Sequence, residues 1–400
     1  MKIDVTESYK VPGFVAGGIH AGIKENSLKD LALIYSTVPA KASGVFTTNA
    51  FKAAPVLLDQ ERIKSGVAQA ILINSGNANA ATGAKGYQDA VSMARFASSN
   101  LGIEEDRVLV ASTGIIGHRL PIDKIEAGVS RLIPGLHEEG IPEAGEAIMT
   151  TDKFMKIASR QAIIGGKNVT VCGIAKGAGM IEPHMATLLA FVMTDVDIAL
   201  PLLQRTFKRA VGNSFNIITV DGCMSTNDTA IILANGVAGN PLIKGSSKNL
   251  QTFYEMLLGV LSNLARSMVR DGEGATKVIE IVVEEANSTD DARKVAYAVA
   301  NSNLVKTAVF GCDPNWGRVL QAAGASGVSL SPETVRLFFE DIPVFAGGQA
   351  VHGHENELAK VMAGETIRIR INLGMGERAF RVCASDLSYD YVKINAHYHT

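Results

Sequence analysis

The sequence predicts an α/β fold: a layered α/β sandwich, in which helices cover mixed sheets, with a smaller C-terminal α/β domain. Short runs of β-branched and aliphatic residues alternate with amphipathic helical segments along the chain. A length of 400 residues favours two domains, and a hydrophobic content of 47% is enough for large cores. The alternation starts again after Gly274, so we expect one domain over residues 1–275 and another over residues 276–400.

Strands are expected where such runs lie between turn residues. In the first domain they fall at residues 31–38, 43–49, 69–75 and 107–113, and in the second at 277–286, 366–374 and 379–385. Residues 159–177 predict a β-hairpin with Gly165-Gly166 at its turn. The run 186–198 is apolar at too many consecutive positions for an edge strand, so it predicts a central strand covered on both faces.

Helices are expected where apolar residues recur every three to four positions. Residues 248–272 show this pattern most fully, with Phe253, Met256, Val260 and Leu264 on one stripe. The other helices are predicted at residues 86–102, 121–133, 199–214, 291–302 and 316–326.

Composition excludes several classes of protein. A formal net charge of −2 gives no basis for broad electrostatic capture of nucleic acid or of an anionic membrane. We expect no transmembrane helix, because no run of 18 apolar residues occurs, and no signal peptide, because "MKIDVTESYKVPGF" lacks an apolar core. The four cysteines are far apart and form no CxxC pair, which favours free thiols in a cytoplasmic protein.

Thr187 is the one hydroxyl residue in the apolar run "MATLLAFVM". Threonine is common in strands, so this position needs no function. The alternative is a nucleophile produced by self-cleavage, because breaking the Ala186–Thr187 bond would give Thr187 a free α-amino group. Such an amine has a pKa of about 7.7–8.0 in model peptides and can act as general base for the adjacent hydroxyl. The chain contains no competing GxSxG motif.

Three other segments carry candidate binding residues. In "STGIIG", a hydroxyl and a backbone N–H at Thr113-Gly114 can bind an oxyanion, or the segment is a plain turn after a strand. Lys176, before "GAGM", can bind a carboxylate or be solvated. Glu273, between two glycines in "RDGEGATK", can meet an amino group, or it simply follows a helix that ends with Gly272.

Two H-x-H pairs, His352/His354 and His397/His399, place two imidazoles on one face if they lie on strands. No carboxylate–cysteine pattern completes a ligand set beside either pair. We therefore expect no metal and no bound cofactor.

Taken together, several motifs resemble the ornithine acetyltransferase family, the bifunctional glutamate N-acetyltransferases of the cyclic arginine pathway. They occur in the family's order over most of the chain. The segments are "STGIIG", "IMTTD", "KGAGMIEPHMATLLAF", "TVDGCMSTNDT", "DGEGATK", "GCDPNWGR" and "SDLSYDYVKINAHYHT".

The resemblance implies a precursor that cleaves itself between Ala186 and Thr187 into pieces of 186 and 214 residues, which stay together as an α2β2 assembly. Thr187 would take the acetyl group from N2-acetyl-L-ornithine and pass it to L-glutamate in a ping-pong cycle. The family's oxyanion positions match Thr113 and Gly114. Its substrate contacts match Thr150 (or its neighbour Thr151), Lys176, Thr187, Glu273, Asn395 and Thr400.

Three positions depart from the family's pattern. His184 stands where asparagine is common, Leu188 where methionine is common, and Cys223 at a position that is often acidic or polar. Leu188 conserves volume. His184 lies three residues before the expected cut, where a group that titrates near neutrality would alter cleavage or the pH response of the pocket.

Two other functions remain open at this point. The first is a self-processing aminopeptidase or amidase, in which water replaces glutamate as the acceptor. The second is a binding protein whose chain stays intact. Members of the family differ in whether acetyl-CoA also donates the acetyl group, and no residue of this chain decides that point.

Overall fold

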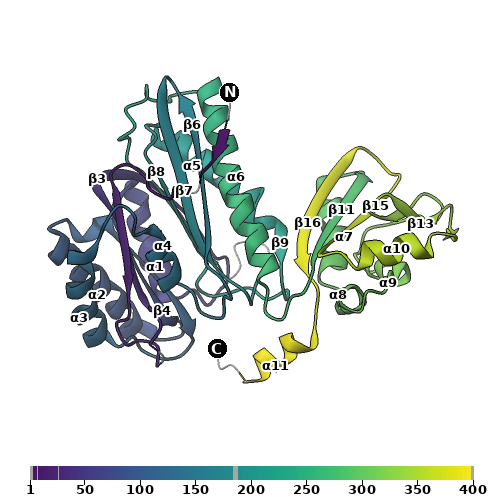
Figure 1. The fold of residues 1–400 in the computed structure, drawn as a ribbon, viewed down its shortest axis with the longest axis horizontal. Helices are drawn as coiled ribbons and strands as arrows, with labels where there is room; N and C mark the ends of the chain where they lie inside the picture. The colour runs from purple at the N-terminus through teal and green to yellow at the C-terminus, as the bar shows by residue number, and fades with distance from the viewer. Residues whose placement is uncertain (1–2, 7, 26, 183–187, 398–400) are drawn as a thin grey trace.

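A computed structural model describes residues 3–6, 8–25, 27–182 and 188–397. Two sheets organise this part of the chain (Figure 1). The first has nine strands among the described residues, in the order β1-β6-β7-β8-β10-β3-β4-β5, with β2 paired to β3. The strands are β1 (Ile3–Val5), β2 (Phe14–Ile19), β3 (Leu31–Phe46), β4 (Val67–Asn77), β5 (Val108–Ile115), β6 (Lys156–Ile164), β7 (Lys167–Lys176), β8 (Leu189–Thr194) and β10 (Thr229–Ala234).

The first sheet folds over, so that its two halves face each other across a shared core. Ile34, Ile73 and Leu109 from β3, β4 and β5 belong to one buried cluster with Phe191 and Ile231 from β8 and β10. Three helices cover the outer face of the β3-β4-β5 half, and two cover the outer face of the β7-β8-β10 half. They are α1 (Ala54–Arg62), α2 (Gly83–Leu101) and α3 (Ile122–Leu132), then α5 (Leu200–Gly212) and α6 (Lys248–Arg270). The layers thus confirm the predicted α/β sandwich.

The second sheet has seven strands within the described ranges, in the order β14-β13-β12-β15-β11-β16-β9. Four helices, α7 to α10, lie along it, and a separate buried cluster joins the sheet to them (Figure 1). The strands are β9 (Ile218–Thr219), β11 (Val278–Ala286), β12 (Arg336–Phe339), β13 (Ile342–Ala346), β14 (Gln349–Ala350), β15 (Thr366–Asn372) and β16 (Arg378–Ser385). The helices are α7 (Thr289–Ala300), α8 (Asn303–Phe310), α9 (Trp316–Gly324) and α10 (Glu355–Met362).

The remaining elements connect these layers. Helix α11 (Tyr389–His397) follows β16 and runs from the second sheet back toward the lower end of the first (Figure 1). The others are α4 (Ile141–Ala147) and the 3₁₀ turns η1 (Ile63–Ser65), η2 (Glu105–Arg107), η3 (Ile133–Gly135) and η4 (Phe215–Ile217).

Local sequence explains the elements that were predicted. The β6–β7 hairpin turns at Gly165 and Gly166, whose φ angles of 58° and 82° belong to a turn that favours glycine at both positions. Helix α6 begins where the Ser247 side chain accepts a hydrogen bond from the N–H of Leu250, and its predicted stripe is buried. Every residue of β8 is buried, with β7 and β10 on either side, which confirms a central strand.

Two predictions of strand boundaries were wrong. The strands predicted at residues 31–38 and 43–49 are one strand, β3 (Leu31–Phe46), and residues 47–49 lie beyond its end. This strand continues through Pro39 at an irregularity between Tyr35 and Ala40. Proline has no N–H to give to the ladder, and such a bulge is where a strand tolerates it. Strand β10 was not predicted at all, although it pairs with both β8 and β3. No helix in the described ranges combines the length and apolar character needed to cross a bilayer.

A buried ion-pair triad fastens the start of β6 to the end of α6. The Lys156 ammonium donates to Asp152 Oδ1 at 2.6 Å and to Asp271 Oδ2 at 2.5 Å, and all three side chains are fully buried. Asp271 also accepts a hydrogen bond from the backbone N–H of Lys153 at 3.0 Å. Each buried charge therefore has a partner, as burial of charge requires.

Replacing Lys156 by methionine will leave two carboxylates buried without their cation. We expect Lys156→Met to lower the free energy of unfolding by about 3–5 kcal/mol, the usual cost of breaking one side of a buried pair. Urea denaturation followed by far-ultraviolet circular dichroism measures this. Lys294→Met is the matched control, because Lys294 pairs with Asp290 at 2.9 Å on the exposed face of α7. Equal shifts in the two variants would contradict a structural role for the triad.

Candidate active site

A small pocket lies where β5 and β7 end, and α11 contributes part of its wall. Its volume is about 140 Å³, below the roughly 300–1,000 Å³ of sites that enclose drug-sized ligands. Of the described residues, these line it: Ala78, Thr113, Gly114, Ile116, Thr150, Thr151, Lys176, Gly179, Met180, Asp221, Cys223, Ser225, Thr226, Asn227, Glu273, Tyr391 and Asn395. Every predicted site residue that the structure describes is therefore at this pocket.

Thr113 and Gly114 are brought there by the end of β5. Thr113 is buried, and its Oγ1 accepts a hydrogen bond from Lys176 Nζ at 3.2 Å. Gly114 has a φ of 132°, and a Cβ built on it would lie 2.3 Å from the carbonyl carbon of Gly76. Since that contact is with backbone, no side chain fits at this position. The close approach of the Gly114 and Gly76 backbones explains why residue 114 is glycine. No side chain at that position covers the backbone that faces the pocket.

Lys176 is the last residue of β7, and its side chain is buried. Burial lowers the pKa of the ammonium, and Asp152 only partly opposes this effect. Across the described part of the chain, Lys176 forms no ion pair within 4.0 Å. A buried cation with a hydroxyl as its close partner is suited to receive an anionic ligand.

Asp152 organises the backbone around Lys176. Its Oδ1 accepts a hydrogen bond from Gly177 N–H at 2.8 Å, and its Oδ2 accepts one from Thr150 N–H at 2.9 Å. Burial opposes ionisation of this carboxyl, but Lys176 and Lys156 outweigh burial and lower the pKa of Asp152 to about 2. The carboxylate is therefore ionised at neutral pH. Its two backbone hydrogen bonds hold the loop of Thr150 against the end of β7. The same carboxylate also pairs with Lys156 in the buried triad.

Glu273 comes from the loop after α6. Its N–H donates to Ala178 O at 2.8 Å, and its Oε2 accepts a hydrogen bond from Asn395 Nδ2 at 2.9 Å. A Cβ built on Gly179 would lie 2.5 Å from the Glu273 carboxylate carbon, so the glycine makes room for this side chain. Asn395 belongs to α11, so the C-terminal helix is tied to the pocket by this bond.

Sequence reasoning missed Asp221 and Tyr391. Asp221 accepts hydrogen bonds from the N–H groups of Met180 (2.5 Å) and Ile181 (2.9 Å), and one from the Tyr391 hydroxyl (3.3 Å). Burial raises the pKa of Asp221, while the hydrogen bonds from backbone N–H groups oppose the shift. The motif "TVDG" drew attention to the segment. However, no neighbouring residue indicated that the carboxylate of Asp221 would accept hydrogen bonds from the backbone of Met180 and Ile181.

Several predicted residues lie outside the described part of the chain: Ala186 and Thr187 at the expected cut, His184 and Thr400. The pocket also does not distinguish Thr150 from Thr151, because both line it. Of the two described departures from the family's pattern, Leu188 is buried and Cys223 is exposed at the pocket. Although the residue is exposed overall, partial desolvation of its sulfur, followed by the charge of Asp221, raises the pKa of the Cys223 thiol, so it stays protonated at neutral pH.

The described residues thus supply binding groups. Lys176 offers a cation, Glu273 an anion, Asn395 an amide, and the Thr113-Gly114 turn a hydroxyl beside bare backbone. Such a set suits a small ligand with both a carboxylate and an ammonium group. No group of three or more histidine, cysteine, aspartate or glutamate side chains in the described ranges is arranged to hold a metal.

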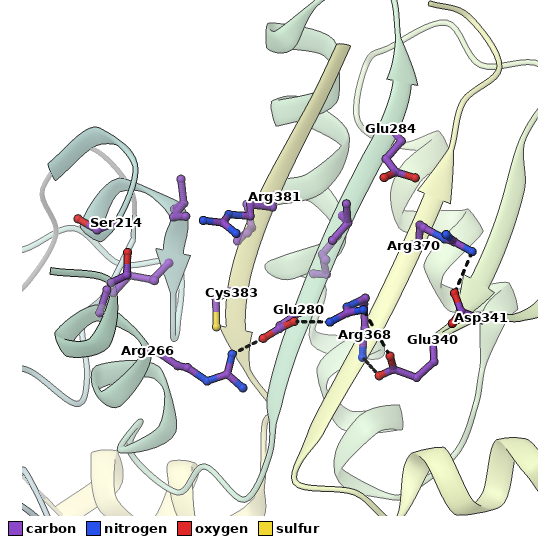
Figure 2. Close-up of a pocket in the computed structure, with 17 residues that line it drawn as sticks. Ser214, Arg266, Glu280, Glu284, Glu340, Asp341, Arg368, Arg370, Arg381 and Cys383 are labelled. Atoms are coloured by element: carbon purple, nitrogen blue, oxygen red, sulfur yellow. Dashed lines mark hydrogen bonds and ion pairs between the residues drawn. The ribbon is translucent and has the colours of Figure 1, made fainter. Parts of the chain in front are cut away.

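A larger cavity of about 490 Å³ lies on the open face of the second sheet (Figure 2). Three of its four arginines have carboxylate partners among the described residues, and Arg381 is the exception. The pairs are Arg266 with Glu280, Arg368 with Glu280 and Glu340, and Arg370 with Asp341. Burial raises the pKa of the Cys383 thiol in its wall to about 12, which makes it a poor nucleophile. This cavity contains none of the predicted site residues, and it has the chemistry of a solvated ion-pair surface.

Comparison with known proteins identifies the family of this chain. The profile of the ArgJ family matches residues 15–400. An arginine biosynthesis bifunctional protein ArgJ from Geobacter sulfurreducens is 49% identical over 98% of this chain and 100% of its own length. Another, from Caldanaerobacter subterraneus subsp. tengcongensis, is 49% identical over 97% of each chain.

A crystal structure of arginine biosynthesis bifunctional protein ArgJ from Bacillus halodurans is 37% identical, with a TM-score of 0.50. The match covers 98% of that chain but only 52% of this one. Family profile and relatives cover nearly the whole sequence. The chain therefore belongs to the ArgJ family.

Proposed function

We propose that this protein is a self-cleaving acetyltransferase of arginine biosynthesis, which moves an acetyl group from N2-acetyl-L-ornithine to L-glutamate. Membership of the family supports the reaction class. The observation that supports it most within the molecule is the convergence of Thr113, Gly114, Lys176, Glu273 and Asn395 on one pocket. These residues come from four separate segments of the chain, because Thr113 and Gly114 are neighbours.

Thr187 is the proposed nucleophile, and it would first act on its own chain. Its Oγ attacks the carbonyl carbon of Ala186, the peptide C–N bond breaks, and water hydrolyses the resulting ester. The products are the Ala186 carboxylate and a free α-amine on Thr187. That amine would then serve as general base for the same hydroxyl.

In the first half of the transfer, Thr187 Oγ attacks the acetyl carbonyl of N2-acetylornithine while the amine takes the hydroxyl proton. The Thr113-Gly114 turn stabilises the oxyanion of the tetrahedral intermediate. The C–N bond then breaks, the proton passes to the leaving amine, and ornithine departs from an acetyl ester on Thr187. In the second half, the glutamate amine attacks this ester, and the threonine hydroxyl is restored.

Substrate recognition follows from charge. Lys176 would bind the substrate carboxylate and Glu273 an ammonium group, with Asn395 and either Thr150 or Thr151 completing the pocket. Thr400 is a further proposed contact. We also propose acetyl-CoA as a second acetyl donor, which the relatives' description as bifunctional proteins supports.

The assembly proposed is α2β2, built from both pieces of two precursors, in the cytoplasm. The Bacillus halodurans chain supports two pieces, since it is almost fully matched by about half of this sequence. The free state of all four cysteines suits a reducing compartment. We further propose domains over residues 1–275 and 276–400, each built on one of the two sheets, with β9 reaching from the first into the second.

Self-cleavage predicts two chains. Intact-mass spectrometry of the purified wild type should give masses for residues 1–186 and 187–400, and Thr187→Ala should give one uncut chain. A single chain of 400 residues in both samples would reject the proposed nucleophile and its base.

Acetyl transfer predicts a new amide on glutamate. Wild-type enzyme incubated with N2-acetylornithine and isotopically labelled glutamate should yield labelled N-acetylglutamate and an equal amount of ornithine, measured by mass spectrometry. Ornithine released at the same rate without glutamate, and free acetate in its place, would instead identify an amidase.

Removal of the Lys176 charge should weaken binding of the substrate carboxylate. We expect Lys176→Met to raise KM for N2-acetylornithine by about 10–100-fold, the loss of one charge-assisted hydrogen bond. Lys167→Met, on the exposed end of the β6–β7 hairpin, is the matched control and should leave KM unchanged.

The wild-type pH profile gives a second readout. Because burial lowers the pKa of Lys176, KM should begin to rise with increasing pH below the ordinary range of lysine, as the ammonium loses its proton. A KM that stays constant in both tests would remove Lys176 from the binding site.

A further inference from the structure

The Asp228 carboxyl is buried immediately before β10, and only one of its oxygens is satisfied. Asp228 is 0% exposed, and its Oδ1 accepts a hydrogen bond from the N–H of Leu188 at 2.9 Å. Its Oδ2 has no hydrogen-bond partner within the described part of the chain. Buried carboxyls with an unpartnered oxygen are uncommon and call for an explanation beyond packing.

The partner of Asp228 occupies a special place in the chain. The Leu188 nitrogen belongs to the peptide bond that follows Thr187. The ladder bonds of β8 start at Leu189, which pairs with Lys176 and with Thr229. Asp228 therefore provides a hydrogen bond one residue beyond the strand, on the side of the proposed nucleophile. The Leu188 carbonyl is held too, by the N–H of Thr229 at 3.0 Å.

Self-cleavage makes this bond more important. Once the Ala186–Thr187 bond is broken, Thr187 is a chain terminus, and termini are poorly ordered unless they are tied down. The covalent path to the rest of the protein then runs only through Leu188. A peptide unit is planar, so an acceptor that fixes the Leu188 N–H also restrains the carbonyl to which that nitrogen is bonded.

We propose that Asp228 is the positioning residue for Thr187: its carboxyl holds the Leu188 N–H and so presents the threonine for self-cleavage and for acetyl transfer. This inference rests on the proposed function. Asp228 acts through the peptide bond and takes no part in the covalent steps.

The neutral form of the carboxyl is sufficient for this task. Burial raises the pKa of Asp228 well above its usual range. The bond from Leu188, then the charge of Lys176, then the nearby hydroxyls of Thr47 and Ser225 only partly oppose the shift. A neutral carboxyl accepts through its carbonyl oxygen, as an asparagine amide does. Asn in place of Asp228 should therefore preserve the positioning, whereas alanine removes the acceptor.

The experiment compares Asp228→Ala, Asp228→Asn and Asp195→Ala with the wild type. Asp195 is the matched control, because it is a buried carboxyl just beyond the other end of β8 that accepts a backbone N–H, from Thr170 at 2.8 Å. Each chain is pulse-labelled in the expression host, chased for timed intervals and separated on a denaturing gel. Thermal melting of the purified proteins is measured alongside.

We expect Asp228→Ala to slow self-cleavage by about 10²-fold, the effect of an ångström-scale misplacement of a reacting group. Asp228→Asn should cleave like the wild type. Asp195→Ala should also cleave like the wild type, even if its melting temperature falls as far as that of Asp228→Ala.

Three outcomes would overturn the inference. If Asp228→Ala cleaves itself at the wild-type rate, the hydrogen bond from Leu188 to Asp228 is dispensable. If Asp195→Ala cleaves as slowly as Asp228→Ala, the slowing reflects a general loss of stability. If Asp228→Asn cleaves as slowly, the task needs an ionised carboxylate and a neutral hydrogen-bond acceptor is not enough. Failure of the proposed function itself is distinct, because the wild type would then remain uncut.

Discussion

The candidate site depends on one buried cation, the ammonium of Lys156. It donates hydrogen bonds to both Asp152 and Asp271 and, although burial opposes ionisation, the charges of Lys176 and Lys156 together keep the pKa of Asp152 low. Asp152 then has two acceptor positions left for backbone N–H groups, and these fix Thr150 and Gly177. Asp271 begins the loop that carries the candidate carboxylate of the pocket. A structural ion pair thus sets the positions of binding groups from three segments that are distant in sequence.

The second buried cation of the site, the ammonium of Lys176, differs from Lys156 in having no carboxylate partner among the described residues. Lys176 is buried like Lys156 but has a hydroxyl, from Thr113, as its hydrogen-bond partner. Leaving a buried ammonium without an ion pair is costly, and a ligand carboxylate removes that cost when it binds. The two lysines, twenty residues apart on β6 and β7, therefore differ in their partners: Lys156 pairs with carboxylates that hold the loops, and Lys176 forms no ion pair within the described residues, as its proposed contact with a ligand carboxylate requires.

The sequence was informative where the signal is local, and uninformative where a residue acts across the fold. Gly165-Gly166 predicted its hairpin, and the apolar run after Thr187 predicted a central strand, because each depends on neighbouring residues alone. Strand β10 is an exception: it was missed although turn residues flank its short apolar run, Asn227-Asp228 before it and Asn235-Gly236 after it. The motifs placed Lys176 and Glu273 in a site, but Asp221 and Asp228 act by accepting backbone N–H groups about 40 residues away. No spacing within the sequence records such a contact.

Sheet topology also explains how a chain could be cut in its centre and stay assembled. A cut after Ala186 would give β1 to β7 to one piece and β8 and β10 to the other. In the sheet, however, β8 and β10 lie between β7 and β3, so strands of the second piece are flanked on both sides by strands of the first. Two ladders, β7–β8 and β3–β10, would then join the pieces, and the core that contains Ile34 and Phe191 would be shared. Because these contacts are the interior of a fold and not a surface between two folds, separation would require unfolding both pieces, and cleavage would release only the terminus at Thr187.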